Sequence, residues 1–96
     1  MKKIIVTVQD LKSGFADPFI IDNEQLAIRM FRASLHDNSK SIMAIYPEDF
    51  RLVKIGEFDS KTGLVEGLPE TKFVILANGT DFKVDERSFS DGNEVS

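Results

Sequence analysis

The stretch DPFIIDNEQLAIRMFRASLH, residues 17–36, predicts a short strand that runs directly into one amphipathic helix. Five apolar side chains recur at helical spacing and share one broad face, with Ile28 at its margin. They are Leu26, Ala27, Met30, Phe31 and Leu35. The rest of the chain shows sheet and turn patterns, so we expect a sheet to pack against this helix.

Residues typical of helix caps occur at both ends of this helix. Asp22 is the expected N-cap, because its carboxylate can accept hydrogen bonds from the free N–H groups of the first turn. Gln25 completes a capping box, and Ile21 with Leu26 forms a hydrophobic staple. Asn38 is the expected terminator, in the role that glycine usually fills.

The polar face of the helix carries a basic ridge formed by Arg29, Arg32 and His36. Arginine forks match phosphate oxygens, so one interpretation is an edge that contacts nucleic acid. The other interpretation is an ordinary solvated face, with cations near the C-terminus where the helix dipole favours them. Both interpretations stay open at the level of sequence.

Two long strands are predicted, one before the helix and one after it. Residues 3–9 alternate between two faces and are rich in β-branched side chains. Residues 50–59 form the second strand, and Gly56 within it indicates a bulge or a close backbone approach. A hairpin loop that ends at Gly63 then returns the chain as a partner strand over residues 64–68.

Shorter segments complete the expected fold. Residues 10–17 are predicted as a loop, residues 42–45 are compatible with one helical turn, and residues 73–77 favour a strand over a helical turn. The fold class is therefore α+β, with a small, mostly antiparallel sheet of about four strands and one main amphipathic helix on one face. We expect one globular domain over residues 1–80 and an acidic, partly disordered tail over residues 81–96. Open sheet edges leave room for a homodimer.

The composition argues against several kinds of chemistry. The chain has no Cys and a single His, so disulfides, thiolate metal sites and three-His metal sites cannot form. Its glycines occur singly and match no phosphate-binding or dinucleotide-binding motif. Loop carboxylates at Asp10, Asp17 and the pair Glu48-Asp49 keep a Mg²⁺-dependent enzyme as the least favoured hypothesis. We expect a protein that is not an enzyme and has no cofactor, metal or small-molecule substrate.

Charge and hydropathy limit the partners and the compartment. The net charge of −4 argues against a strongly basic nucleic-acid coat, but most of the excess acid follows residue 80. The nearly neutral remainder can still carry a basic patch. No apolar run approaches the ~20 residues that span a bilayer, and polar residues interrupt the first apolar segment too early for a signal peptide. We expect a cytoplasmic protein that does not contact membranes.

An ordered set of motifs is shared with a known family. The motifs are MKKI at residues 1–4, Asp10, Pro18-Phe19, the capped helix with Ala27, Arg29 and Phe31, YPEDFRL at residues 46–52, IGEFD at residues 55–59, and Thr62-Gly63. In this order, residues 1–68 resemble the small nonstructural protein of gokushovirus-type microviruses, phages with small circular single-stranded DNA genomes.

This resemblance implies a function. It implies a nonstructural phage protein that is made in the cytoplasm of the infected bacterium and is absent from the mature virion. It also implies a role in genome replication, at the switch from duplex replication to single-strand synthesis and packaging, and members are often labelled DNA-binding. No catalytic residue carries over. The matched positions are Arg29, Phe31, Phe50, Leu52, Ile55, Gly56 and Phe58.

Two function hypotheses follow. The first is a replication accessory protein that binds single-stranded DNA or the replication complex through Arg29, Arg32 and His36, extended by Arg51 and Lys54. Phenylalanines exposed on a sheet would add base stacking; the candidates are Phe15, Phe19 and Phe50. The alternative is an adaptor that contacts host or phage replication proteins without binding DNA, which the net acidity favours.

Overall fold

The two longest strands, β1 (Lys2–Asp10) and β4 (Phe50–Asp59), pair antiparallel at the centre of the computed structural model, which describes residues 1–36 and 41–82. Both were predicted from alternating β-branched and aromatic side chains. Their pairing runs from Lys2 opposite Asp59 to Asp10 opposite Phe50. One bulge interrupts it, where Ile55 is the extra residue on β4.

Each outer edge of the sheet is a strand broken in two. On one side β2 (Gly14–Phe15) and β3 (Phe19–Ile21) both pair with β1. On the other side β5 (Val65–Gly67) and β6 (Val74–Asn78) both pair with β4. The described part of the chain therefore forms six strands in four antiparallel rows, more strands than the four or so that were predicted.

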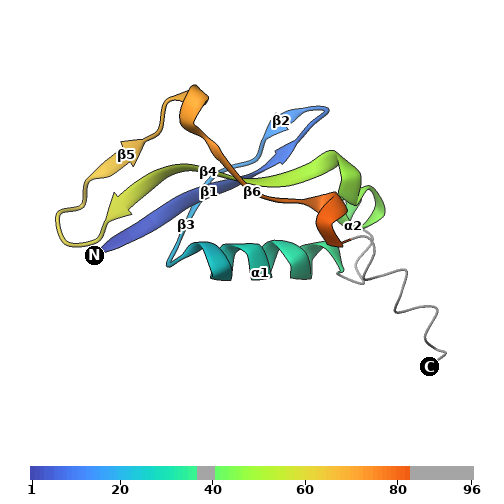
Figure 1. Ribbon diagram of the computed structural model, residues 1–96, viewed down its shortest axis with the longest axis horizontal. Helices are drawn as coiled ribbons and strands as arrows, with labels where there is room; N and C mark the ends of the chain where they lie inside the picture. Colours follow the sequence, from blue (N-terminus) through green and yellow to red (C-terminus); the bar gives the residue numbers. More distant parts are fainter. Residues whose placement is uncertain (37–40, 83–96) are drawn as a thin grey trace.

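Helix α1 (Glu24–Leu35) lies across one face of this sheet and confirms the predicted amphipathic helix (Figure 1). Its residues Ala27, Phe31 and Leu35 are buried in the core. The sheet contributes Ile4, Val6, Ile21, Phe50, Leu52 and Ala77. Leu26 and Met30 were expected on the same face but stay 38% and 49% exposed. Met30 lines a groove together with Phe19 of the short edge strand β3.

The start of α1 corrects the predicted cap. Asn23, and not Asp22, is the N-cap, since its side-chain oxygen accepts a 2.8 Å hydrogen bond from the backbone N–H of Leu26. The Asp22 carboxylate instead pairs with the ammonium group of Lys3 at 3.3 Å. Because the cap moves by one residue, Gln25 no longer stands at the third helical position that a capping box requires.

The segments after α1 follow the predicted order. The helix ends at Leu35 with His36 as its C-cap, and the predicted terminator Asn38 lies outside the described residues. Helix α2 (Ile42–Ile45) confirms the helical turn. A 3₁₀ turn, η3 (Gly79–Phe82), closes the described chain and includes the first two residues of the predicted tail over residues 81–96. The rest of that tail lies outside the described residues. Within the described ranges, no helix is long and apolar enough to cross a membrane.

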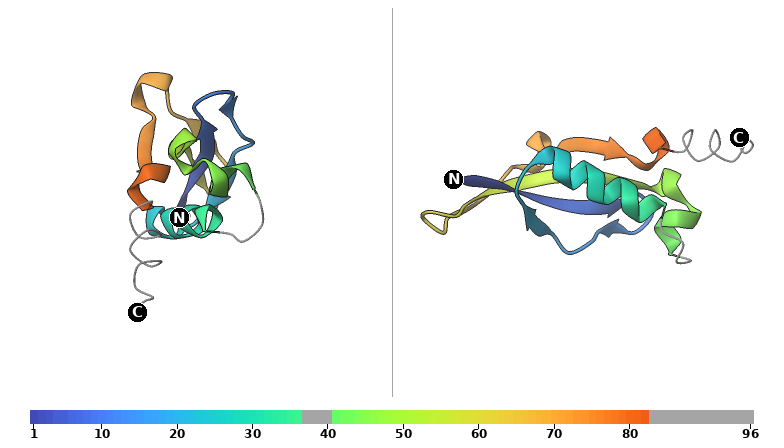
Figure 2. Two further views of the ribbon diagram at one scale, coloured as in Figure 1. Left: turned by 90° about the vertical axis from the view of Figure 1, so that its right-hand side faces the viewer. Right: turned by 90° about the horizontal axis from the view of Figure 1, so that it is seen from below.

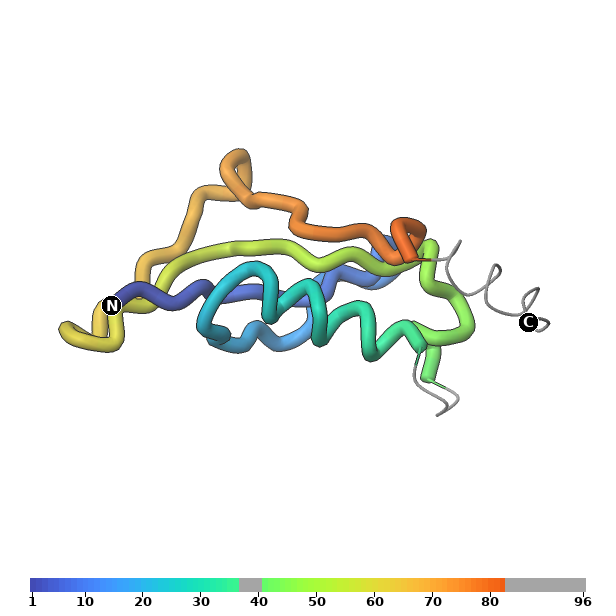
Figure 3. Tube along the Cα trace, turned by 60° about the horizontal axis from the view of Figure 1, so that its bottom comes forward, coloured from blue at the N-terminus to red at the C-terminus, as the bar shows by residue number. Residues whose placement is uncertain are grey.

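Two arms rise from the sheet on the face opposite α1, as the left view of Figure 2 shows. One arm is the turn that carries β2, a segment predicted as plain loop because a strand of two residues leaves no alternation pattern. The other arm joins β5 to β6 through the 3₁₀ helix η2 (Glu70–Lys72). Figure 3 shows β4 running between β1 and β6.

The arms meet above the sheet. The rings of Phe15 on β2 and Phe73 just before β6 lie edge to face, with their centroids 6.1 Å apart. Below this level Thr7 and Val53 are only 1% and 2% exposed. The hydroxyl of Thr7 donates a 2.7 Å hydrogen bond to the carbonyl oxygen of Ala16, which satisfies this buried polar group.

Candidate nucleic-acid interface

The predicted basic ridge lies on the outer surface of α1. Arg29, Arg32 and His36 are all exposed there. The guanidinium of Arg32 sits 5.5 Å from the ring centroid of Phe82, a cation–π contact at the margin of the helix. Nδ1 of His36 lies 3.0 Å from the carbonyl oxygen of Arg32, so the imidazole also closes the end of α1. Arg29 is the member of the ridge on the most outward part of the helix.

Lys54 does not join this ridge. Its ammonium group lies 3.4 Å from the carboxylate of Glu57 and 4.0 Å from that of Glu24, beneath the start of α1. The hydrogen bond from Lys54 and the charge of Lys54, with a smaller effect of Lys2, hold the pKa of the Glu57 carboxyl below its ordinary value. Lys54 is thus locally neutralised, which weakens its attraction for phosphate.

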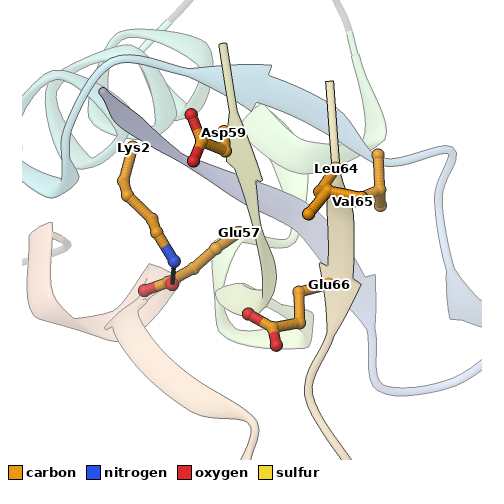
Figure 4. A pocket seen from close by; sticks show the side chains of 6 residues that line it. All are labelled: Lys2, Glu57, Asp59, Leu64, Val65 and Glu66. Atoms are coloured by element: carbon orange, nitrogen blue, oxygen red, sulfur yellow. Dashed lines mark ion pairs between the residues drawn. The ribbon is translucent and has the colours of Figure 1, made fainter. Parts of the chain in front are cut away.

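A cavity of about 350 Å³ at the free end of the β4–β5 hairpin is acidic (Figure 4). It is lined by Lys2, Glu57, Asp59, Leu64, Val65 and Glu66. The hydrogen bond from the backbone N–H of Lys61 and the nearby terminal ammonium lower the pKa of the Asp59 carboxyl. Three carboxylates against one lysine disfavour phosphate here. In the described residues, no group of three or more His, Asp or Glu side chains could hold a metal ion.

A second hollow, of about 300 Å³, lies on the sheet face opposite α1, between the two arms. It is lined by Gln9, Phe15, Arg51, Val53, Glu70, Phe73 and Ile75. We call it the arm hollow. Phe15 is 52% exposed and Arg51 is half-buried, so an aromatic ring and a cation are both accessible from solvent.

Arg51 is held in place within the arm hollow. It stands directly opposite Gln9 in the β1–β4 pairing, and its Nε donates a 2.6 Å hydrogen bond to Oε1 of Gln9. No ion pair to Arg51 occurs among the described residues. The outer end of the guanidinium therefore keeps its N–H donors for a ligand.

The arms add further positive charge. Lys12 lies in the turn before β2 and Lys72 lies in η2, one on each arm. Neither forms an ion pair with another described residue, whereas Lys2, Lys3 and Lys54 all do. Cations without ion-pair partners thus occur on the arms and on the floor between them.

The structure distributes the predicted site residues over separate places. Arg29, Arg32 and His36 lie together on α1, Lys54 lies beneath the start of that helix, and Arg51 lies on the opposite face of the sheet. Their role in binding nucleic acid stays a prediction. The sequence could have predicted that Arg51 lies apart from the helix ridge. Side chains alternate between the two faces of a strand, so Arg51 lies on the face opposite to the core residues Phe50 and Leu52.

The three phenylalanines proposed for base stacking have different positions. Phe50 is buried at 6% exposure, and Phe19 lies on the helix side of the sheet edge. Phe15 is the one of the three on the open face. Sequence reasoning missed Phe73 and Gln9. Gln9 could have been found, because it alternates in phase with Thr7 and so points away from the helix, but Phe73 comes to the hollow through the fold of its arm.

An apolar groove of about 300 Å³ borders α1 on the side of β3. Its lining is Val8, Phe19, Ala27, Met30, Phe31, Ser34, Met43 and Leu52. Phe19 and Met30 are 38% and 49% exposed at its rim. This groove has no charged lining residue, so its chemistry suits an apolar protein surface better than a nucleic acid.

A protein-family model matches most of the chain. The family model described as Phage ORF5 protein matches residues 3–82, which include α1, both arms and all of the sheet except Lys2 of β1. Comparisons with curated proteins and with solved structures found no match.

Proposed function

This chain belongs to the Phage ORF5 protein family, and from that premise we propose that it assists phage genome replication by binding single-stranded DNA. The resemblance to the nonstructural proteins of gokushovirus-type microviruses supports a finer role, at the switch to single-strand synthesis and packaging. On this proposal the protein works in the cytoplasm of the infected bacterium and is absent from the mature virion. It binds DNA or the replication complex, and it is neither an enzyme nor dependent on a cofactor.

The observation that carries the proposal is the arm hollow on the sheet face opposite α1, where Phe15 is exposed and Arg51 is half-buried. Proteins that bind single-stranded nucleic acids combine two features. Aromatic rings stack with the bases, and cations along the groove contact the phosphate backbone. A sheet face that no helix covers is a common platform for this chemistry. Here Arg51 supplies the cation on the floor, and Lys12 and Lys72 supply it on the arms.

The overall acidity of the chain sets the expected strength of binding. Few cations without ion-pair partners surround the arm hollow, so few phosphates can be neutralised at once and affinity should be modest at physiological salt. The basic ridge of Arg29, Arg32 and His36 lies on the opposite side of the molecule from the arm hollow. A single strand would have to pass around the edge of the sheet to reach both.

The proposal predicts salt-dependent binding that depends on Arg51. We expect a labelled single-stranded oligonucleotide to bind at low salt, as measured by fluorescence anisotropy, and to dissociate as salt rises. Arg51→Ala should weaken binding, because it removes the cation on the floor of the arm hollow. Arg29→Ala and Arg32→Ala, tested together, report on the helix ridge in the same way.

Lys61→Ala is the matched control, because it removes an exposed cation from the β4–β5 turn, far from the arm hollow. Its binding curve should overlay that of the unaltered protein. Circular dichroism melts check that each variant is folded. The absence of any binding at low salt, or binding that Arg51→Ala leaves unchanged, would count against the sheet face as the DNA site.

The apolar groove beside α1 supports a second candidate function. An adaptor that docks a replication protein would use an exposed apolar surface such as Phe19 and Met30, and it would need no DNA affinity. This candidate predicts that a partner is recovered from infected cells by the unaltered protein and lost with Met30→Glu. Recovery that Met30→Glu does not change would remove the groove from consideration.

A further inference from the structure

The polar groups of the arm hollow have a pattern that suits one nucleobase better than the others. We propose that the arm hollow binds a single unstacked guanine base, an inference that rests on the proposed binding of single-stranded DNA. Stacking sites alone are tolerant of sequence, because every base has a flat face. Discrimination needs donors and acceptors at the base edge, and three polar side chains line this hollow: Gln9, Arg51 and Glu70.

The aromatic pair provides the flat contact. The rings of Phe15 and Phe73 are inclined at 80° to each other, so a base that stacks on one ring meets the other ring edge-on. Phe15 is more than half exposed and lies on a two-residue strand, so its face is accessible to a base that enters from solvent. A base held by these rings would share the hollow with the three polar side chains.

Arg51 supplies a fork of donors. Its Nε is already engaged by Oε1 of Gln9 at 2.6 Å, which restricts the guanidinium to one orientation. The N–H groups at its outer end form a parallel pair, and such a pair matches two adjacent acceptors on a base. Guanine presents this arrangement at O6 and N7, the commonest specific contact of arginine with DNA. Adenine places an amino group where guanine has O6, so a donor would meet a donor.

Glu70 supplies the complementary acceptor. It lies in η2 on the arm opposite β2, and it is one of the residues that line the same hollow. Guanine carries N–H groups at N1 and N2, on the side of O6 away from N7, so a carboxylate on the other side of the hollow can accept from both. Cytosine is the nearest competitor, because it offers adjacent acceptors to Arg51 but a single amino group to Glu70. Thymine offers neither arrangement in full.

The test compares short oligothymidylates that differ at one central position, which is guanine, adenine, cytosine or thymine. Competition is followed by fluorescence anisotropy at one low salt concentration. We expect the guanine oligonucleotide to bind about tenfold more tightly than the adenine one, the discrimination that a bidentate arginine contact provides. Arg51→Lys keeps the charge but removes the fork, so the guanine preference should disappear while salt-dependent binding remains.

Two further variants complete the design. Glu70→Gln should reduce the preference for guanine over cytosine, because an amide presents only one acceptor atom to the base. Lys61→Ala is the matched control, since it removes an exposed cation from the β4–β5 turn and should leave the ratio of the guanine and adenine affinities unchanged. Circular dichroism melts verify that the three variants fold like the unaltered chain.

The outcomes separate the two proposals. Oligonucleotide binding with equal affinity for all four central bases would overturn the guanine site and leave the proposed function standing. A guanine preference that persists in Arg51→Lys would also overturn it, because guanine would then be recognised elsewhere. Failure of every oligonucleotide to bind the unaltered protein would overturn the proposed function and the guanine site together.

Discussion

Asn23 shows how one residue determines where the long helix begins. Asp22 and Asn23 are both favourable N-cap residues, and the sequence alone favoured Asp22 because it aligns with a capping box. In the structure Asn23 has the extended backbone of a cap, with φ −159° and ψ 170°, and its side chain accepts from Leu26. The direction in which the chain leaves β3 decides which of the two neighbouring residues becomes the cap, and no local sequence pattern predicts that direction.

We expect Asn23→Ala to lower the free energy of unfolding by about 1 kcal/mol, the typical loss when a helix cap is removed. Asp22→Ala is the control at the adjacent position. It removes an ion pair with Lys3 in which the Asp22 side chain is 66% exposed, so its effect should stay within about 0.5 kcal/mol. Urea unfolding of both variants measures the difference, and a larger loss for Asp22→Ala would contradict the assigned cap.

At the scale of the element, β4 combines a bulge with a close backbone approach. Gly56 lies next to the extra residue Ile55 and directly opposite Gly67 on β5. A Cβ atom at Gly56 would lie 2.6 Å from the carbonyl oxygen of Glu66, which is backbone and cannot move aside easily. The predicted bulge or close approach at Gly56 is confirmed, and both features are present.

Gly56→Ala should therefore force β5 away from β4 and lower the free energy of unfolding by about 1–3 kcal/mol, as overpacking does. Gly67→Ala, at the partner position, is the matched control, since nothing lies within 4 Å of a Cβ there. Urea unfolding should show a loss for the first variant and little change for the second. Equal losses would indicate a general intolerance of the strand pair to side chains, and would refute the specific contact with Glu66.

The elements that sequence reasoning missed are the short ones. β1, β4 and α1 could be predicted because their apolar periodicity extends over many residues. β2 has two residues and is defined by its pairing with Gln9 and Asp10, so it cannot be recognised without its partner strand. The same limit applies to the candidate site. Arg51 could be assigned to the open face from the phase of β4, but its neighbour Phe73 could not, because η2 brings it there.

At the scale of the whole molecule, the α+β class and the single main helix followed from the order of apolar patterns. The positions of the candidate binding surfaces did not follow from the sequence. From the sequence, Arg51 and Lys54 were grouped with Arg29. In the structure, the sheet separates Arg51 from α1, and Lys54 forms an ion pair with Glu57. A chain with a net charge of −4 can still present local cations, because Lys12 and Lys72 on the two arms form no ion pair with another described residue, whereas Lys2 and Lys3 do. The homodimer suggested by open sheet edges stays a prediction.

We expect single-stranded DNA to bind on the sheet face between the arms. Chemical-shift mapping by NMR, with an unlabelled oligonucleotide added to isotope-labelled protein at low salt, tests it most directly. We predict that the largest backbone shifts occur at Gln9, Phe15, Arg51 and Phe73, with much smaller shifts along the outer face of α1. Shifts confined to the surface around Arg29, or no shifts at all, would contradict the account.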